Sequence, residues 1–241
     1  MSTTLCFDFG NTRMKCAVFS NKELKEEILL EDDSAATIES IIASHQPKKS
    51  ILSSVIRHAD IVEQVLAAHT SFHKLGHTSK IPFSTPVGKP ETIGADRLAI
   101  CAAAVDLFPN KHTLAIGLGT CITFNFISTF HEFLGGGISP GMLMRFRAMH
   151  EQTALLPLVT PDSNFPLIGY DTKTNILSGV ILGIVKEIDG IIDAYKEKYD
   201  ELNVVLTGGD MHFFVPHLKN KIFADPYLIY KGLLAISEHN S

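Results

Sequence analysis

A short pattern that predicts a β-hairpin occurs twice in this chain of 241 residues. The first copy is Thr4–Thr12, with the sequence TLCFDFGNT, and the second is Thr113–Cys121, with the sequence TLAIGLGTC. In each copy an apolar run leads into a turn of glycine and a hydroxyl residue, and a second apolar run follows. The repeat predicts an α/β protein of two similar lobes, residues 1–108 and 109–241, packed around a cleft.

The composition excludes several classes of function. Hydrophobic residues make up 45% of the chain and charged residues 20%, as in ordinary globular proteins, and the formal net charge is −5. This charge, with no basic tract, argues against nucleic acid or a membrane as the main partner. No apolar run has the length of a bilayer span, no secretory signal is visible, and the four cysteines lack metal-site spacing. We therefore expect a cytoplasmic protein.

The first hairpin turn carries the residue types that hold a metal-bound polyphosphate. Asp8 offers a carboxylate for Mg²⁺, directly or through water, and Gly10 lets the backbone approach a phosphate. Asn11 and Thr12 add side-chain donors, and Lys15 adds a positive charge. A plain hairpin turn is the alternative interpretation, since Gly-Asn turns are common.

The second hairpin has Gly117 where the first has Asp8, but it keeps a glycine and a hydroxyl in its turn, Gly119 and Thr120. Two further glycine-rich stretches follow it, Gly135–Gly141 before a predicted helix and Thr207–Asp210 after a predicted strand. Such stretches can seat an anion on backbone N–H groups. They can equally serve only to shape a hairpin, a helix entry and a turn.

The segment Gly94–Arg97 predicts the start of a helix with a carboxylate in its first turn. The helix dipole favours the charged form of Asp96 there, and an ionised carboxylate beside a substrate hydroxyl can act as a general base. The neighbouring Arg97 could bind a carboxylate or phosphate. The alternative is a helix-start Asp with a solvated Arg. A Pro-rich stretch over residues 82–93, expected to be an ordered loop, favours a site slightly.

Periodicity and capping residues predict the remaining elements. The strands are expected at Lys48–Ser54 and Asn203–Leu206, and the helices at Ser34–His45, at Asp60–His69 with Asp60 as N-cap, from Gly94 to Phe108, from Met142 to Leu155 with Pro140 in the first turn, after Asp171 or Thr172 as N-cap, and from about Tyr230.

The ordered set of motifs resembles the type III pantothenate kinase family over nearly the whole chain. The motifs are DxGNT at Asp8–Thr12, GxDR at Gly94–Arg97, GTxxT at Gly119–Thr123, GGxIxPG ending at Gly141, TAxLP at Thr153–Pro157, DTxxNIxxG at Asp171–Gly179 and LTGGD ending at Asp210. That family belongs to the actin-like and sugar-kinase superfamily. The resemblance therefore implies two ribonuclease-H-like lobes.

The resemblance also implies an activity, phosphorylation of pantothenate by ATP to 4′-phosphopantothenate, the first step of coenzyme A biosynthesis. It implies a requirement for Mg²⁺ and for a monovalent cation, K⁺ or ammonium. It further implies a homodimer with the pantothenate site at the subunit interface.

Residue roles follow from the same resemblance. Asp96 would be the general base, and the residues that bind pantothenate would be Gly94, Ala95 and Arg97, with Thr172 reaching the partner subunit's pantothenate. Residues around the ATP phosphates would be Asp8, Gly10, Asn11, Thr12, Lys15, Gly119 and Thr120. Gly208 and Gly209 would lie near the adenosine, and Asp8 would engage Mg²⁺.

Three positions depart from the family pattern. Gly117 and Asn125 stand where the family carries aspartates, which puts a monovalent cation site near Gly117 in question. Val87 stands where the family carries an aromatic residue. Two other hypotheses therefore stay open: a catalytically weakened binding or regulatory protein, and a related kinase that acts on another small hydroxylated acid.

Overall fold

The computed structural model describes residues 2–240, and the chain divides into two compact units. The first unit runs to Pro109 and also takes in His131–Leu134 and the chain from Tyr227 onward, whereas the second contains Asn110–Phe130 and Gly135–Pro226. The sequence pattern places the segment after Tyr227 in the second lobe. It belongs to the first unit because its helix packs on elements of that unit.

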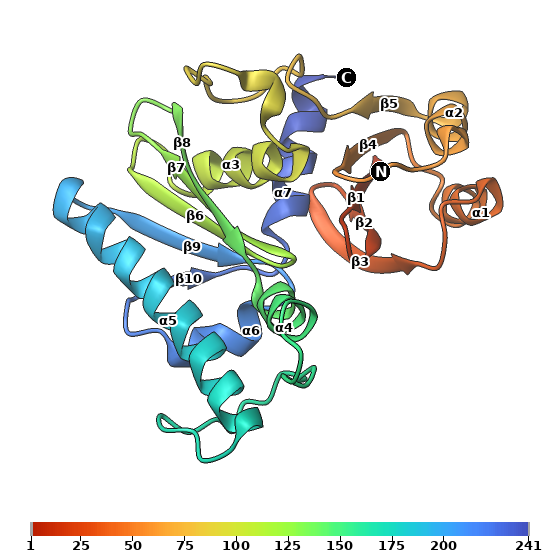
Figure 1. Ribbon diagram of the computed structural model, residues 1–241. Coiled ribbons are helices and arrows are strands. Elements are labelled where there is room, and N and C mark those ends of the chain that lie inside the picture. Colours follow the sequence, from red (N-terminus) through yellow and green to blue (C-terminus); the bar gives the residue numbers. More distant parts are fainter. Residues whose placement is uncertain (1, 241) are drawn as a thin grey trace. The chain divides into compact units, whose positions relative to one another are not determined.

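Groups of strands and helices follow one another along the chain (Figure 1). The strands are β1 (Thr3–Phe9), β2 (Met14–Ser20), β3 (Glu23–Leu30), β4 (Lys49–Ser54), β5 (Ser71–Lys74), β6 (Thr113–Leu118), β7 (Cys121–Ile127), β8 (Phe133–Pro140), β9 (Asn203–Thr207) and β10 (Phe223–Ala224). The helices are α1 (Ala35–His45), α2 (Asp60–His69), α3 (Ala95–Leu107), α4 (Met142–Glu151), α5 (Thr172–Lys198), α6 (Met211–Phe214) and α7 (Leu228–His239), with short 3-10 turns at Pro90–Thr92 and Val215–His217.

The two units share one sheet topology. The first sheet has the order β3-β2-β1-β4-β5, and the second, read from its other edge, has the order β8-β7-β6-β9-β10. In each sheet the central strand pairs antiparallel with the next strand of the chain and parallel with the strand that follows a helix. The duplication that the repeated hairpin predicts is therefore present in the fold.

The first sheet is covered on one face by α1 and α2 (Figure 1). Alternate residues of β1, namely Leu5, Phe7 and Phe9, pack with these helices in a buried core. Because successive strand residues point to opposite faces, Cys6 and Asp8 lie on the other face. Helix α7 contacts β1 and β4 there, so the carboxylate of Asp8 points to the side that α7 covers.

In the second unit, the long helix α5 supplies much of the core. Its buried positions Ile176, Val180, Ile184 and Ile188 recur at helical spacing and pack with apolar residues of β6, β7 and β9. Among the described residues, no helix combines the length and the apolar composition that crossing a membrane requires.

Several local predictions need correction. The N-cap of α2 is Ala59 and not Asp60, which is the first helical residue and has its charge in the first turn. Pro140 ends strand β8 and does not open the next helix, which stops at Glu151. Of the two predicted N-caps of α5, Asp171 is the one present, with a reciprocal hydrogen-bond pair to Thr174, and α7, expected from about Tyr230, begins at Leu228.

Strand β8 is absent from the sequence prediction because its glycines are typical of a loop. Two of them, Gly135 and Gly136, have positive φ angles of +100° and +148°. A Cβ atom on Gly136 would lie 2.0 Å from the backbone oxygen of Phe124 in β7. The glycines therefore allow close pairing of the two strands, although glycine generally weakens a strand.

Helices α3 and α7 approach each other at Gly232. A Cβ atom there would lie 1.8 Å from the backbone oxygen of Ala99.

We expect Gly232→Ala to lower the free energy of unfolding by more than about 3 kcal/mol, because two backbones would have to separate. Denaturant unfolding measures this. In Gly190→Ala, where a Cβ meets nothing within 4 Å inside α5, stability should rise by up to about 1 kcal/mol. Equal stability of the two variants would contradict the close approach.

Candidate functional site

The first hairpin turn follows the end of β1. Asp8 is opposite Lys15 and Phe9 is opposite Met14 in the antiparallel register of β1 and β2. The N–H of Gly10 donates to the backbone oxygen of Arg13 at 3.0 Å, which closes the turn. Asn11 is exposed at the tip. The local sequence thus places a carboxylate, a lysine and a polar turn at one end of the sheet.

Burial dominates the electrostatics of Asp8. The pKa of this carboxyl is raised to about 7: burial is the largest cause, the nearby carboxylate of Asp96 adds to it, and the positive charge of Lys15 opposes both. Ser53, the register partner of Asp8 on β4, also lowers this pKa from its buried position. Within the described chain the Ser53 hydroxyl makes no hydrogen bond of good geometry. Asp8 and Ser53 together form a small set of oxygen atoms suited to a cation.

Asp96 lies in the first turn of α3, where the sequence predicts it. Gly94 is the N-cap, and a Cβ atom there would lie 2.5 Å from Oδ1 of Asp96. The glycine therefore leaves room for the carboxylate. Burial raises the pKa of Asp96, while the backbone N–H and the positive charge of Arg97 lower it. The helix dipole favours the charged form of Asp96, but in the folded chain the loss of solvation has the larger effect on its pKa.

Arg97 follows Asp96 on α3, and its guanidinium carbon lies 5.3 Å from the ring centre of Phe133. This cation–π contact holds the arginine at a defined position. The loop before α3 is ordered, as its sequence predicts, because Ser84 pairs with residues 131–133: its N–H donates to His131 at 2.9 Å and its oxygen accepts from Phe133 at 2.8 Å. Ala95 is buried as the first residue of the helix, and Val87 is half-buried in the loop.

In the second unit, three glycine-containing segments meet at the end of β6. A Cβ atom on Gly141 would lie 2.0 Å from the backbone oxygen of Gly119, and one on Gly208 would lie 2.2 Å from that of Leu118. Gly208 also has a φ of +101°, whereas Gly209 has open space at its Cβ position. The N–H of Gly141 donates to the oxygen of Thr120 at 3.0 Å. Backbone groups of separate segments thus surround the second turn.

Gly117 and Asn125, the two departures from the family pattern, lie on the same face of the second sheet. Gly117 is buried in β6 opposite Thr123. The Asn125 side-chain amide donates to the backbone oxygen of Ala115 at 3.1 Å and to Oγ1 of Thr123 at 3.2 Å. A carboxylate could not donate these bonds. Asn125 is therefore a buried structural donor in this chain.

Thr172 is the first residue of α5 and is exposed. The preceding Asp171 accepts from the N–H of Thr174 at 2.7 Å, and its own N–H is bonded to Oγ1 of Thr174 at 3.1 Å. This capping box fixes the backbone at Thr172 and leaves its side chain open to a partner.

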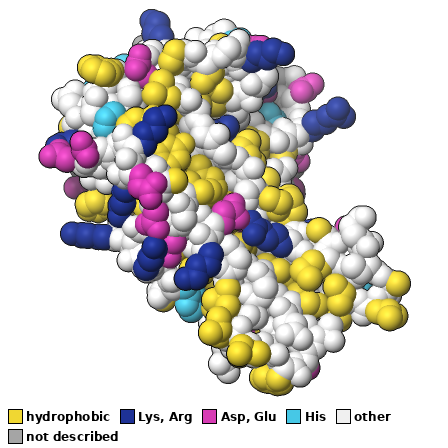
Figure 2. Space-filling model, turned by 60° about the vertical axis from the view of Figure 1, so that its left-hand side comes forward, with side chains coloured by type: hydrophobic (Ala, Val, Ile, Leu, Met, Phe, Trp, Pro, Cys, Tyr) yellow, Lys and Arg dark blue, Asp and Glu magenta, His cyan; other side chains and the backbone are white. Residues whose placement is uncertain are grey.

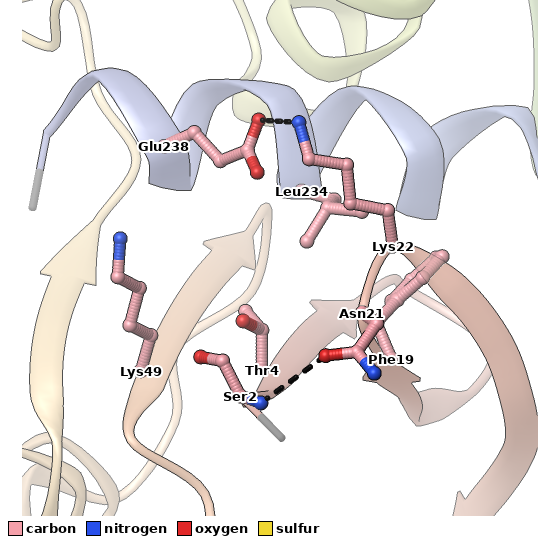
Figure 3. Close-up of a pocket in the computed structure, with 8 residues that line it drawn as sticks. All are labelled: Ser2, Thr4, Phe19, Asn21, Lys22, Lys49, Leu234 and Glu238. Atoms are coloured by element: carbon pink, nitrogen blue, oxygen red, sulfur yellow. Dashed lines mark hydrogen bonds and ion pairs between the residues drawn. The ribbon is translucent and has the colours of Figure 1, made fainter.

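A hollow of about 240 Å³ lies elsewhere in the first unit (Figure 3). Ser2 and Thr4 line it from the start of β1, and Lys49 lines it from the start of β4. Asp8 lies at the other end of β1. The Lys22–Glu238 ion pair at 3.0 Å closes one side of this hollow (Figure 3). Neither Asp8 nor Asp96 lines this hollow.

Asp8 and Asp96 are far apart in the sequence but belong to the same unit, where the charge of Asp96 raises the pKa of Asp8. Sequence reasoning missed Ser53, Glu27, Tyr230 and Phe133, which contact or adjoin the predicted residues. Ser53 gave one signal, a polar residue inside an apolar strand. The others belong to no motif.

Comparison with known proteins shows the fold and the family of this chain. Two units of the same strand order, each with a glycine-containing turn after its central strand, form a fold that this chain shares with solved sugar kinases. The chain belongs to the type III pantothenate kinase family, whose sequence model matches residues 4–194. The members of that family are kinases that transfer phosphate to pantothenate.

Individual relatives are consistent with this family. The chain is 41% identical over 238 residues to the type III pantothenate kinase of Christiangramia forsetii, with 98% of each chain covered. A solved structure from Campylobacter jejuni, described as a conserved Baf family transcriptional activator, superposes with a TM-score of 0.66 at 21% identity over 98% of both chains. A glucokinase from an Antarctic psychrotroph has a TM-score of 0.54 at 10% identity over 100% of both. At such identities the two structures establish the fold alone.

The raised pKa of Asp8 makes stability depend on pH. The folded chain holds this proton up to about pH 7 while the unfolded chain loses it near 3.8, so the free energy of unfolding falls as the pH rises between those values. We expect Asp8→Asn to stabilise the protein by about 1–3 kcal/mol at about pH 8, and by much less at about pH 5.

Denaturant unfolding at the two pH values measures this effect. Glu39→Gln, an exposed position on α1, is the control and should change stability little at either pH. A gain for Asp8→Asn that is the same at both pH values would contradict the assignment.

Proposed function

We propose that this chain transfers the γ-phosphoryl group of ATP to the hydroxyl group of pantothenate, giving 4′-phosphopantothenate in the first step of coenzyme A biosynthesis. One observation carries the residue assignment. Asp8 and Asp96, from the end of a strand and the start of a helix, lie close enough that the charge of Asp96 raises the pKa of Asp8. A carboxylate for a metal ion and a carboxylate for a proton are what phosphoryl transfer to an alcohol requires.

Asp96 is the general base of the proposed reaction. Its carboxylate takes the proton of the pantothenate hydroxyl as the hydroxyl oxygen attacks the γ-phosphorus, and the bond from that phosphorus to the β–γ bridging oxygen breaks to release ADP. Burial raises the pKa of Asp96, so its carboxylate accepts a proton more readily than an exposed aspartate does. Arg97 binds the pantothenate carboxylate, with backbone of Gly94 and Ala95 beside it.

The turn residues bind ATP. In the first unit the binding groups are the backbone at Gly10, the side chains of Asn11 and Thr12, and the ammonium of Lys15. In the second unit they are Gly119 and Thr120 for phosphate, with Gly208 and Gly209 near the adenosine. Support comes from the convergence of backbone segments around Gly119 and from the open space at Gly209.

The residues around Asp8 fit Mg²⁺. Among residues 2–240 no three His, Cys, Asp or Glu side chains form a metal cage. Mg²⁺ needs no such cage, since one carboxylate, water and the phosphates of the nucleotide commonly hold it. Bound there, Mg²⁺ would neutralise charge on the phosphates. Asp8 would hold it, with the buried hydroxyl of Ser53 opposite on the neighbouring strand.

The residues near Gly117 do not fit a monovalent cation site. Gly117 has no side chain, and the Asn125 side chain directs its amide N–H groups at the oxygens of Ala115 and Thr123. We derive no step through K⁺ or ammonium at this position.

Replacing the base should abolish the activity. We expect Asp96→Asn to reduce pantothenate-dependent ADP release by about 10²–10⁴-fold, because the amide cannot take the proton. Coupled ADP-release assays with Mg²⁺ or Mn²⁺, with and without K⁺ or ammonium, measure this. Asp106→Asn, an exposed position on the same helix, is the control and should keep full activity. Turnover of Asp96→Asn at the rate of the unmodified protein would overturn the assignment of the base.

We also propose a homodimer that completes the pantothenate site, with Thr172 reaching the partner subunit's substrate. The segment before Thr172 exposes large apolar side chains: Leu155 is 92% exposed, Leu167 80%, Ile168 81% and Tyr170 82%. Figure 2 shows hydrophobic side chains gathered toward its lower edge, the end at which Figure 1 draws the connection between α4 and α5. Such a surface is typical of a protein interface. An enzyme of this pathway that uses ATP is expected in the cytoplasm.

Charged residues in this segment should separate the subunits. We expect the double variant Leu167→Asp and Ile168→Asp to sediment as a monomer at concentrations where the unmodified chain is a dimer, because each carboxylate would be buried unpaired. Phe130→Asp is the control, since Phe130 is 83% exposed but lies on a different turn. A monomeric unmodified chain, or a dimeric double variant, would contradict the proposal.

A further inference from the structure

Lys15, beside the first turn, belongs to a chain of hydrogen bonds that ends in the protein core. Its ammonium donates to Oε1 of Glu27 on β3 at 2.9 Å. The hydroxyl of Tyr230 on α7 donates to the same oxygen at 2.8 Å. One carboxylate oxygen therefore joins three elements of the first unit, β2, β3 and α7.

The register explains how these side chains meet. Lys15 is opposite Asp8 on one side and opposite Leu29 on the other, and Glu27 is opposite Ala17, two residues along from Lys15. Asp8, Lys15 and Glu27 therefore point to the same face of the sheet, with Asp8 directly opposite Lys15 and Glu27 its diagonal neighbour. This is the face that α7 covers.

Tyr230 is fixed far more firmly than a surface residue. It is only 2% exposed, and two residues further along α7 the close approach of Gly232 to Ala99 sets the position of the helix. A tyrosine hydroxyl in such surroundings needs a partner, and Glu27 provides it. Tyr230, which is held in the core, thus fixes the position of Glu27, and Glu27 in turn fixes the position of Lys15.

The electrostatics agree with this geometry. Partial burial by itself raises the pKa of Glu27, but the hydrogen bonds from Lys15 and Tyr230 and the positive charges of Lys15 and Arg13 together bring it below its usual value. Glu27 is therefore an ionised partner for Lys15 at neutral pH.

A simple surface ion pair is the competing explanation, and the same hairpin contains one for comparison. Lys25 and Glu23 pair at 2.6 Å on β3, with half or more of each side chain exposed. Their pair contains no buried third residue, whereas about a quarter of the Lys15 side chain and a third of the Glu27 side chain are exposed. Exposed pairs contribute little to a defined geometry, but a pair anchored to a buried hydroxyl holds its members in place.

We propose that Glu27, itself held by Tyr230, is a positioning residue that keeps the Lys15 ammonium available to the phosphates of ATP. The inference rests on the proposed function, in which Lys15 binds phosphate. Lys15 is the register partner of Asp8. Without Glu27, the flexible lysine would be drawn to the Asp8 carboxylate, and both groups would be lost to the nucleotide and its metal ion.

The test uses steady-state kinetics and calorimetric ATP binding on the full chain. We expect Glu27→Gln and Tyr230→Phe each to raise KM for ATP about 5–20-fold, with kcat and KM for pantothenate within about threefold of the unmodified values. Tyr230→Phe keeps the buried ring and removes only the hydroxyl. Lys15→Met should raise KM for ATP at least as much, and adding Glu27→Gln to it should have no further effect. Glu23→Gln is the matched control and should change none of these values.

The outcomes distinguish the positioning role of Glu27 from the phosphate-binding role of Lys15. If Lys15→Met raises KM for ATP while Glu27→Gln and Tyr230→Phe do not, the positioning role is wrong and the phosphate role of Lys15 stands. If Lys15→Met leaves ATP binding unchanged, the proposed phosphate role is wrong and the positioning role falls with it. Additive effects of Lys15→Met and Glu27→Gln would also overturn the inference. Thermal unfolding of each variant checks the fold, and Tyr230→Phe tests the idea independently if Glu27→Gln is unstable.

Discussion

Partial burial of a polar strip on one face of the first sheet is the constraint on which the proposed site depends. Asp8, Lys15, Glu27 and Ser53 share that face, and α7 covers it. Burying such groups is costly unless each finds a partner, so the strip is built as a connected set. Glu27 joins Lys15 to Tyr230, while Asp8 retains a raised pKa. The buried hydroxyl of Ser53 has no hydrogen-bond partner among the described residues, and it lies opposite Asp8, the group that a metal ion would bind.

Glycine plays the corresponding role in the second unit. At Gly141 and Gly208 a Cβ atom would overlap the backbone around the end of β6, so these glycines bring separate segments against the turn at Gly119. The two units therefore use the same strand order differently. The proposed binding groups are charged side chains in the first unit and backbone groups in the second. Gly117 and the structural amide of Asn125 agree with that division, because no acid is left on that face at either position.

Much of the fold follows from local patterns. The repeated hairpin predicts both central strand pairs, helical periodicity predicts α1, α3 and α5, and Asp171 is one of the two predicted N-caps of α5. The residues around the proposed site were harder to predict from the sequence. Glu27 belongs to an exposed-looking polar strand, and Tyr230 lies in a helix that the sequence pattern places in the other lobe. The contact between Glu27 and Tyr230 depends on the strand register and on the packing of α7 across the sheet, and neither is marked by a sequence motif.

The sequence by itself determined the two turns, the order of the motifs, the family to which the chain belongs and the identity of its two central acids, because turn chemistry and capping act over a few residues. Only the tertiary structure decided the state of those acids. The helix dipole favours a charged Asp96, yet burial raises its pKa, and Asp8 responds to a carboxylate remote in sequence. A pKa depends on every charge and dipole within a few ångströms and on the water that folding excludes, and sequence spacing records neither.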